Sequence, residues 1–302
     1  MLDVLLKGDR IQFGERLVVS FHRTLRLPDD GRTYPLPAGL GLFPIVPWHH
    51  EGRDDLLVPL YRREALWIGF SGAIWKPNAL KVVVGGINAV SGQADDVAAL
   101  GAPQDYLVCP LQPWLDGFNT GDGTIRQFIA MPLGEGYAIE AGHGLPERGG
   151  VRLVAFEPRP GRFPDEPPPA PPGPVRFATP KAAEPHVMAL GAGGRIRQKI
   201  YPDPHGADAW DPDNRGEATV TLVAAQHFSA LTGRALPPTP IDAATYARAG
   251  LPWFDLYDEE ASTIAPAGGA PPRTIRDRDH EQDQAEQETE VQVESTTILR
   301  RP

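Results

Sequence analysis

The sequence predicts a mainly β protein, built as a sandwich or barrel-like set of antiparallel sheets with a small C-terminal α-helical part. Glycine and proline number 32 and 34 among 302 residues, about twice their ordinary share, and long helices tolerate neither in their interior. Short apolar or alternating stretches recur along the chain, with glycine or proline between nearly every pair. Many short strands with frequent turns are typical of sandwiches and barrels.

The individual strands are expected from their hydrophobic patterns. Residues 18–27 alternate between apolar and polar side chains, the period of two that indicates a half-buried strand. Residues 65–70 and 80–84 are more continuously apolar, which predicts strands that are buried more deeply. The further expected strands are 105–109, 125–131, 137–140 and 151–156.

Composition divides the chain into four parts. The parts are a β-rich body at 1–157, a proline-rich loop or linker at 158–174, a second β part with short helices at 175–260, and a disordered acidic tail at 261–302. Nine of the eighteen residues from 157 to 174 are proline, which favours an extended polyproline-like segment. Eight carboxylates against one arginine lie between 277 and 294, a composition that buries too little apolar area to fold.

Two short helices are expected in the third part, which we expect to pack on the body. Residues 223–231 have helical character, and Gly233 is placed to end that helix. For the second helix, Thr239 is the expected N-cap and Pro240 occupies the first turn. This helix is expected to continue to about Ala249.

Charge and cysteine content exclude several classes of partner. The net charge is −10, and lysine and arginine form no stripe for a phosphate backbone, so no nucleic-acid partner is expected. The longest uncharged run, residues 34–48, is too short and too rich in proline and glycine to cross a bilayer, so no membrane partner is expected. The single cysteine, Cys109, cannot form an intramolecular disulfide, which fits a cytoplasmic location.

The block from 112 to 137 interleaves aromatic residues, turn residues and isolated carboxylates. Asp116 and Glu135 are the candidate catalytic pair of a carbohydrate-active hydrolase, because glycosidic cleavage uses two carboxyl groups about 5–10 Å apart. The candidate ligand-binding residues, which would stack on a sugar ring, are Trp114, Phe118 and Tyr137. The alternative is structural, because glycines beside the carboxylates predict hairpin turns and aromatic residues near turns usually pack in the core.

The densest cluster of side-chain oxygens lies between residues 203 and 214. Its candidate metal ligands are Asp203, Asp208, Asp211 and Asp213. Calcium is the one cofactor considered, because hard cations accept such oxygens in irregular loops, although the spacing does not match an EF-hand. The alternative is a set of Asx turns, in which Asp side chains accept bonds from nearby backbone N–H groups.

Five segments have distinctive residue patterns, at 105–108, 112–117, 125–137, 193–198 and 250–254. Together they resemble an uncharacterised family of bacterial and fungal proteins with no established activity. The resemblance spans roughly residues 15–258 and implies no functional residues. Members of that family are sometimes labelled integral membrane proteins, and this sequence departs from that label because it has no hydrophobic span.

The chain ends in a short apolar and basic segment formed by Ile298, Leu299, Arg300 and Arg301. Such ends on flexible spacers dock on partner proteins, and this layout is similar to the cargo-docking tails of proteins loaded into bacterial protein shells. A frayed terminus is the alternative. We therefore expect a soluble binding or assembly module of unknown ligand, with a tail that docks on a partner protein. The two alternatives are a carbohydrate-active hydrolase and a calcium-stabilised structural protein.

Overall fold

The mainly β prediction is confirmed. The structure is a computed structural model in which strands hold 43% of the chain and helices 11%. It describes residues 1–50, 52–95, 99–166, 187–257, 262–267, 272–282, 291, 293 and 295–300. In these described parts, every helix is too short or too polar to traverse a lipid bilayer.

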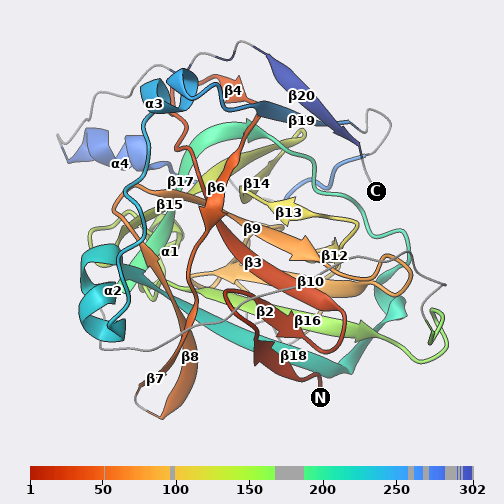
Figure 1. The fold of residues 1–302 in the computed structure, drawn as a ribbon. Coiled ribbons are helices and arrows are strands. Elements are labelled where there is room, and N and C mark those ends of the chain that lie inside the picture. Colours follow the sequence, from red (N-terminus) through yellow and green to blue (C-terminus); the bar gives the residue numbers. More distant parts are fainter. Residues whose placement is uncertain are drawn as a thin grey trace.

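Most strands belong to one hydrogen-bonded sheet that folds over on itself into two layers (Figure 1). The first layer centres on β16, which lies antiparallel between β10 and β18. The bounds in this layer are β10 (Asn78–Val84), β11 (Ile87–Asn88), β12 (Leu107–Cys109), β16 (Val151–Pro158) and β18 (Trp210–Ala224). Both short strands, β11 and β12, pair with β10.

The second layer follows the order β3, β9, β15, β17, with each strand antiparallel to the next. The bounds of these four strands are β3 (Leu17–Thr24), β9 (Ala65–Ser71), β15 (Thr124–Pro132) and β17 (Val187–Arg197). The shorter strands along its edges are β4 (Thr33–Tyr34), β6 (Gly39–Leu42), β13 (Trp114–Leu115) and β14 (Gly117–Gly121).

The two layers are joined at two places along β18. At one end, Met188 of β17 pairs with Leu222, and β18 also runs parallel to β8 of the β7–β8 hairpin. In the first half of β18, the carbonyl of Arg215 accepts the backbone N–H of Leu2 at 3.0 Å, and from Leu2 the chain continues through β1 and β2 to β3. The pairing therefore closes into a circuit, consistent with a barrel-like assembly. The remaining bounds are β1 (Val4–Leu6), β2 (Ile11–Phe13), β7 (Val46–His50) and β8 (Arg53–Leu60).

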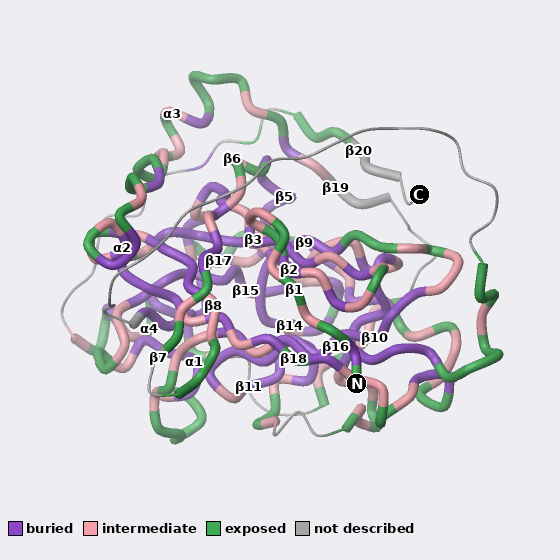
Figure 2. Tube along the Cα trace, turned by 60° about the horizontal axis from the view of Figure 1, so that its bottom comes forward, coloured by how far each residue is buried: buried purple, intermediate pink, exposed green. Residues whose placement is uncertain are grey.

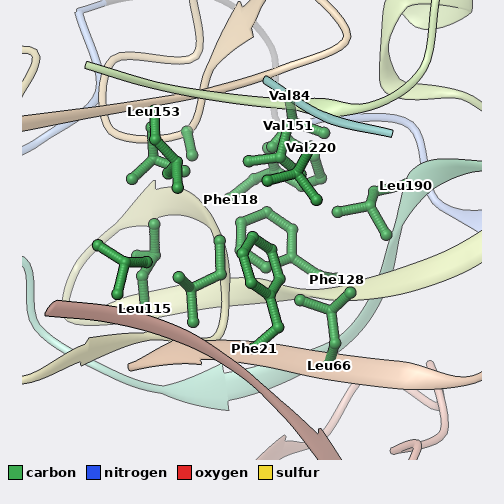
Figure 3. Packing of buried hydrophobic residues seen from close by; sticks show 14 of the residues in the cluster. Phe21, Leu66, Val84, Leu115, Phe118, Phe128, Val151, Leu153, Leu190 and Val220 are labelled. Carbon is green, nitrogen blue, oxygen red and sulfur yellow. The ribbon is translucent and has the colours of Figure 1, made fainter. Parts of the chain in front are cut away.

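The hydrophobic core lies between the layers. Figure 3 shows Phe21, Phe118 and Phe128 of the second layer facing Val151 and Val220 of the first, and all five are at most 2% exposed. Figure 2 shows buried residues running through the central strands, while the turns around α2 and α3 are more exposed. Because strands before and after residues 158–186 share this core, the body and the second β part are one packed unit.

Three of the helices lie in loops. They are α1 (Ile139–Gly142), α2 (Ala225–Thr232) and α3 (Ala243–Arg248). The expected end of α2 is confirmed, because Gly233 follows it with a left-handed φ of 62°. The expected cap of α3 is wrong. Asp242, not Thr239, is the N-cap, and its carboxylate accepts the N–H of Thr245 at 2.6 Å, so the helix starts three residues later.

The prediction that everything after residue 260 is disordered is wrong for two segments. A fourth helix, α4 (Ile275–Glu281), begins with a capping box between Thr274 and Asp277. A terminal strand, β20 (Thr296–Arg300), pairs in parallel with β19 (Trp253–Tyr257), which also pairs with β5 (Leu36–Pro37). Most of the acidic run, including residues 283–290, lies outside the described residues.

Helix α4 is held on the body by a buried ion pair. Arg63 donates two hydrogen bonds to Asp279, at 2.7 and 2.9 Å, and the hydroxyl of Tyr137 donates a third at 2.8 Å. The side chains of Arg63 and Asp279 are only 9% and 7% exposed. Beside them, Ile275 packs against Ile129 and other residues of β15. Burial alone would raise the pKa of Asp279, but the bonds from Arg63 and Tyr137 outweigh it and lower the pKa.

Replacing Asp279 with asparagine should release α4 from the body. D279N keeps the side-chain volume but leaves the buried guanidinium of Arg63 without a counter-charge, so the docked state should lose about 1–3 kcal/mol. Because the pKa of Asp279 is lowered on folding, its contribution is present at neutral pH and is lost as pH falls below about 4. The measurement is amide hydrogen exchange of residues 275–281 at pH 7. Glu281→Gln, an exposed change on the same helix, is the control, and equal exchange in the two variants would contradict the prediction.

Candidate functional site

Asp116 lies in the core between β13 and β14 and is 2% exposed. Its Oδ2 accepts a hydrogen bond from Gln198 Nε2 at 2.9 Å, and its backbone N–H donates to Gln198 Oε1 at 3.0 Å. Burial raises the pKa of Asp116 to about 7, against the smaller lowering effect of hydrogen bonds from the Gln198 and Trp114 side chains. The carboxyl group therefore serves a local hydrogen-bond arrangement inside the fold.

Glu135 lies in a different place. It is exposed in the turn after β15, between glycines with φ of 85° and 77°, and its carboxylate pairs with Arg62 at 2.9 Å. The carbonyl of Asp116 accepts the N–H of Phe128, so Asp116 lies beside Phe128. From Phe128 the strand β15 runs four more residues to Pro132, about 13 Å at 3.3 Å per residue, before the turn that holds Glu135. The structure therefore does not bring Asp116 and Glu135 together as an acid/base pair. The turn expected at Glu135 is present.

The three candidate stacking residues are also separated. Phe118 is a core residue, 4.9 Å from the ring of Phe128 in an edge-to-face contact. Tyr137 is buried beneath α4, where its hydroxyl binds Asp279. Only Trp114 remains partly exposed, with its ring centroid 6.4 Å from that of Trp67. Aromatic residues beside the turns therefore do pack mainly in the core.

Three of the four candidate calcium ligands, Asp203, Asp208 and Asp211, use their carboxylates to bind other groups of the protein. Asp203 Oδ2 accepts bonds from the Tyr106 hydroxyl and the Trp210 indole, both at 2.8 Å. The carboxylate of Asp208 pairs with Arg162 at 2.5 Å. Asp211 accepts the N–H of Asp213 at 3.0 Å, as in an Asx turn.

These contacts favour the turn interpretation of the 203–214 loop. Across the part of the chain that the structure describes, no three His, Cys, Asp or Glu side chains group as a metal site requires. The Oδ2 of Asp203 accepts bonds from a phenol and an indole, its Oδ1 accepts the N–H of His205, and the Asp208 carboxylate carries an arginine counter-charge. Calcium binding at this loop stays a prediction without a converging ligand set.

A cavity of about 1130 Å³ opens at one side of the first layer. Its wall combines the turn after β10, residues 91–95, residues 101–105 and the segment leading into β16. Glycines at 85, 86, 149 and 150 all have left-handed φ values, so the backbone turns tightly and presents its own polar groups to the cavity. The charged and polar side chains in the lining include Ser91, Gln93, Asp95, Asp105 and Arg148.

A buried lysine is the centre of the polar network beside this cavity. Lys81 lies on β10 and is 2% exposed. Its amine binds Asp95 at 2.8 Å, Asp105 at 2.8 Å and the carbonyl of Ala99 at 2.6 Å, so each of its three N–H groups has a partner. A buried charge requires such pairing, because removing one partner of a buried pair costs about 3–5 kcal/mol.

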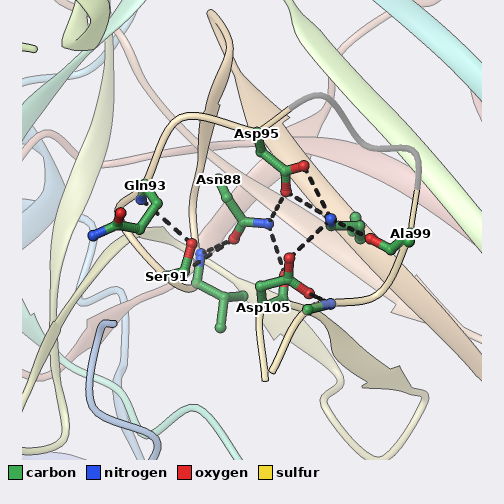
Figure 4. Close-up of polar contacts among 9 residues, drawn as sticks. Asn88, Ser91, Gln93, Asp95, Ala99 and Asp105 are labelled. Carbon is green, nitrogen blue, oxygen red and sulfur yellow. Dashed lines mark hydrogen bonds and ion pairs between the residues drawn. The ribbon is translucent and has the colours of Figure 1, made fainter. Parts of the chain in front are cut away.

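Asn88 of β11 completes the network, as Figure 4 shows. Its Nδ2 donates to Asp95 Oδ2 at 2.6 Å and to the carbonyl of Asp105 at 2.7 Å. Its Oδ1 accepts the backbone N–H groups of Val90 and Ser91 at 2.9 and 3.1 Å. One amide side chain therefore fixes the two sides of the 88–105 loop relative to each other.

Two further segments shape the cavity wall. The buried carboxylate of Glu140 accepts the N–H groups of Arg148 and Gly149 at 3.1 and 2.8 Å, and it lies against Gly85, where any Cβ would overlap it. From the C-terminal part, the N–H of Ala267 donates to the carbonyl of Ser91 at 3.0 Å, and Ala267 itself lines the cavity. The segment predicted to be a disordered tail therefore contributes to the site.

Comparison with protein-family models, with characterised proteins and with solved structures gives no significant match. The resemblance to an uncharacterised family therefore stays a prediction, and the geometry alone identifies the site. Sequence reasoning missed the Lys81 network. The available signal was the single charged residue inside the apolar run 80–84, since a lysine in a buried strand must have a counter-charge.

The burial of Asp116 predicts a specific pH dependence of stability. Because its pKa rises from 3.8 unfolded to about 7 folded, the native state binds the extra proton and loses stability as pH rises from about 4 to 7. Asp116→Asn removes this titration, so the variant should gain up to about 4 kcal/mol on wild type between pH 4 and pH 8. Urea unfolding of wild type and variant at pH 4 and pH 8 measures this difference in the free energy of unfolding. The exposed change Glu135→Gln should show no such trend, and a constant difference for D116N would contradict the assignment.

Proposed function

We propose that the protein is a binding or assembly module that holds a small polar ligand in the cavity beside Lys81. The observation that carries this proposal is the cavity of about 1130 Å³ whose wall is fixed by a charged network with every lysine donor occupied. Ligand sites of this kind are usually preformed concave surfaces of several hundred Å³ with a few placed polar groups.

The same network supports binding rather than catalysis. A lysine nucleophile needs a free amine, whereas the amine of Lys81 donates to Asp95, Asp105 and the Ala99 carbonyl. Asp95 and Asp105 in turn carry the counter-charge of Lys81 and accept bonds from Asn88 Nδ2 and the Gly101 N–H. The alternative of a hydrolase using Asp116 and Glu135 lacks a convergent pair, so we do not favour it.

The lining indicates the chemistry of the ligand. Hydroxyl and amide side chains, two carboxylates, the two arginines Arg148 and Arg152 and the backbone of several glycines surround the cavity, and the lining residues that the structure describes include no aromatic side chain. Such a wall recognises a ligand by hydrogen bonds rather than by ring stacking. A small hydroxyl- or amine-bearing compound fits it best, because the carboxylates accept hydrogen bonds from such groups.

Filling the cavity should abolish stabilisation by such a ligand. A thermal-shift screen of wild type with glucose, trehalose, myo-inositol, free amino acids and spermidine should give at least one increase in Tm. At 100 times Kd the stabilisation is about 2.7 kcal/mol, which corresponds to roughly 5–10 °C for a chain of this size. Ala94 lines the cavity and is exposed, so Ala94→Trp should place an indole in the opening and remove the shift.

The matched control is Ala230→Trp, an exposed position on α2 outside the cavity lining. It should keep the full shift. An equal shift in both variants would place the ligand elsewhere, and turnover of the ligand by wild type would contradict a binding role.

The partner-docking role of the C-terminus is the assembly part of the proposal. The support for it is the position of β20 at one end of the order β20–β19–β5, so one edge of its backbone has no strand neighbour among the described residues. Edge strands present unpaired N–H and C=O groups that pair readily with another chain. The side chains of Ile298, Leu299 and Arg300, and all of Arg301, lie outside the described residues.

Deleting residues 296–302 should remove a partner that the full-length protein captures in pull-downs from its native cell. The expected result is loss of that partner with little change in Tm, because β20 pairs with a single strand, β19, among the described residues. Ile298→Pro is the sharper variant, since proline removes a backbone donor from the strand and leaves its charge unchanged. Identical partner lists for full-length and truncated protein would rule out docking through this segment.

A further inference from the structure

A cluster of aromatic and polar side chains lies on the outer side of the second layer. Its residues, which we call the aromatic face, are Ser20 and His22 of β3, Trp67 and Gly69 of β9, and Trp114 of β13. Their neighbours along the strands, such as Phe21 and Ile68, belong to the core. Because successive strand residues point to opposite sides, the side chains of His22 and Trp67 point away from Phe21 and Ile68, while Trp114 is partly buried and packs against the edge of the core cluster.

Strand register brings the five residues together. His22 lies directly opposite Trp67, and Gly69 is paired with Ser20 on one side and with Trp114 on the other. The cluster therefore spans three adjacent strands. None of its residues lines the cavity beside Lys81, so it is a separate feature of the molecule.

The rings are held in a fixed arrangement. The imidazole of His22 stacks on the Trp67 indole with centroids 3.7 Å apart and planes 7° from parallel. The hydroxyl of Ser20 is 2.8 Å from Nε2 of His22. Burial, with a smaller contribution from the positive charge of Arg10, lowers the pKa of His22 to about 4, so the imidazole is neutral at physiological pH.

Gly69 makes this packing possible. A Cβ at that position would lie 2.9 Å from both Nε2 of His22 and Cζ3 of Trp67, and 3.1 Å from the hydroxyl of Ser20. Without a side chain there, the stacked pair lies close over the strand. The ring planes of the Trp114 and Trp67 indoles lie at 66° to each other, so the two tryptophans form two walls of an angled surface.

We propose that the aromatic face binds a neutral saccharide chain. The indoles of Trp67 and Trp114 are partly exposed, whereas the core tryptophans Trp210 and Trp253 are at most 5% exposed. Indoles offer large rigid surfaces with a polar N–H, and sugar rings present C–H faces for stacking and hydroxyl edges for hydrogen bonds. Beside them the buried Ser20 hydroxyl is bonded to Nε2 of His22, and the partly exposed imidazole of His22 adds a polar group at the edge of the stacked pair.

Other ring-bearing ligands fit less well. Stacking proteins for single-stranded nucleic acids combine aromatic residues with a positively charged groove, and this chain has a net charge of −10 without a basic stripe. A charged imidazole that would favour an anionic sugar is also absent, because His22 is neutral. A proline-rich peptide is the remaining competitor, since such peptides dock in aromatic-lined grooves, and the experiment includes it.

Affinity gel electrophoresis of the full chain tests the proposal. The gels contain hydroxyethylcellulose, laminarin, glycogen or glycol chitin, and at least one should slow the protein. Trp114→Ala should weaken that retardation at least tenfold, and Trp114→Phe, which keeps a ring, should retain part of it. Trp48→Ala is the control, because Trp48 is also partly exposed but lies on β7.

Ala94→Trp separates this proposal from the cavity. Retardation that survives A94W supports an independent site on the aromatic face, whatever the cavity binds. No retardation in any of the four gels would overturn the proposal, and so would retardation unchanged in Trp114→Ala. Should Trp114→Ala fail to fold, the Trp114→Phe variant and quenching of wild-type tryptophan fluorescence by the retarding polysaccharide decide the matter. Binding of a proline-rich peptide in place of all four polysaccharides would also overturn it.

Discussion

Backbone hydrogen bonding along β18 is the constraint on which the rest of the fold depends. A strand of fifteen residues with one side in the core must find partners for its N–H and C=O groups, since each buried group left unpaired costs about 1–3 kcal/mol. β18 meets this need with β16, β8, β17 and the N-terminal segment at Leu2. These partners come from both sides of the proline-rich segment. The backbone hydrogen bonds of β18 therefore hold the two β parts together as one body. They also place β10, with Lys81, in the layer beside the cavity.

Hydrophobic periodicity predicted most of the strands because it is a local property, but the strand expected at 137–140 is wrong, since α1 begins there at Ile139. Alternation in residues 18–27 predicted β3, which spans 17–24, and the apolar run 80–84 predicted most of β10. The C-terminal helix was missed for the opposite reason. Averaged over 261–302 the composition is acidic and polar, but α4 needs only a capping box, Ile275 on β15 and one carboxylate for Arg63. Composition measures how much apolar area a segment can bury, not whether one side chain meets a buried cation elsewhere.

The candidate site was less predictable, because long-range pairing determines it. Asp116 and Glu135 are conspicuous in the sequence, yet one is buried against Gln198 and the other lies in an exposed turn. The carboxylates of Asp95 and Asp105 are less conspicuous, and they meet Lys81 only because the 88–105 loop folds back on β10. Sequence spacing gives the face of a strand on which a residue lies. It does not show which loop packs over that face. That packing takes a carboxylate out of water and makes it part of a site.

Lys81 and Trp67 show two opposite departures from the rule that apolar groups are buried and charges are solvated. Desolvating Lys81 costs several kcal/mol even with good partners, and an apolar residue of similar volume would often be equally stable there. The network therefore adds little stability, and its physical effect is to fix one shape of the 88–105 loop beside the cavity. Trp67 and Trp114 forgo part of the burial energy that indoles provide, about 25 cal/mol per Å² of apolar surface left in water. Neither arrangement is needed to close the sheet, so both favour ligand binding over fold stability as the reason for these residues.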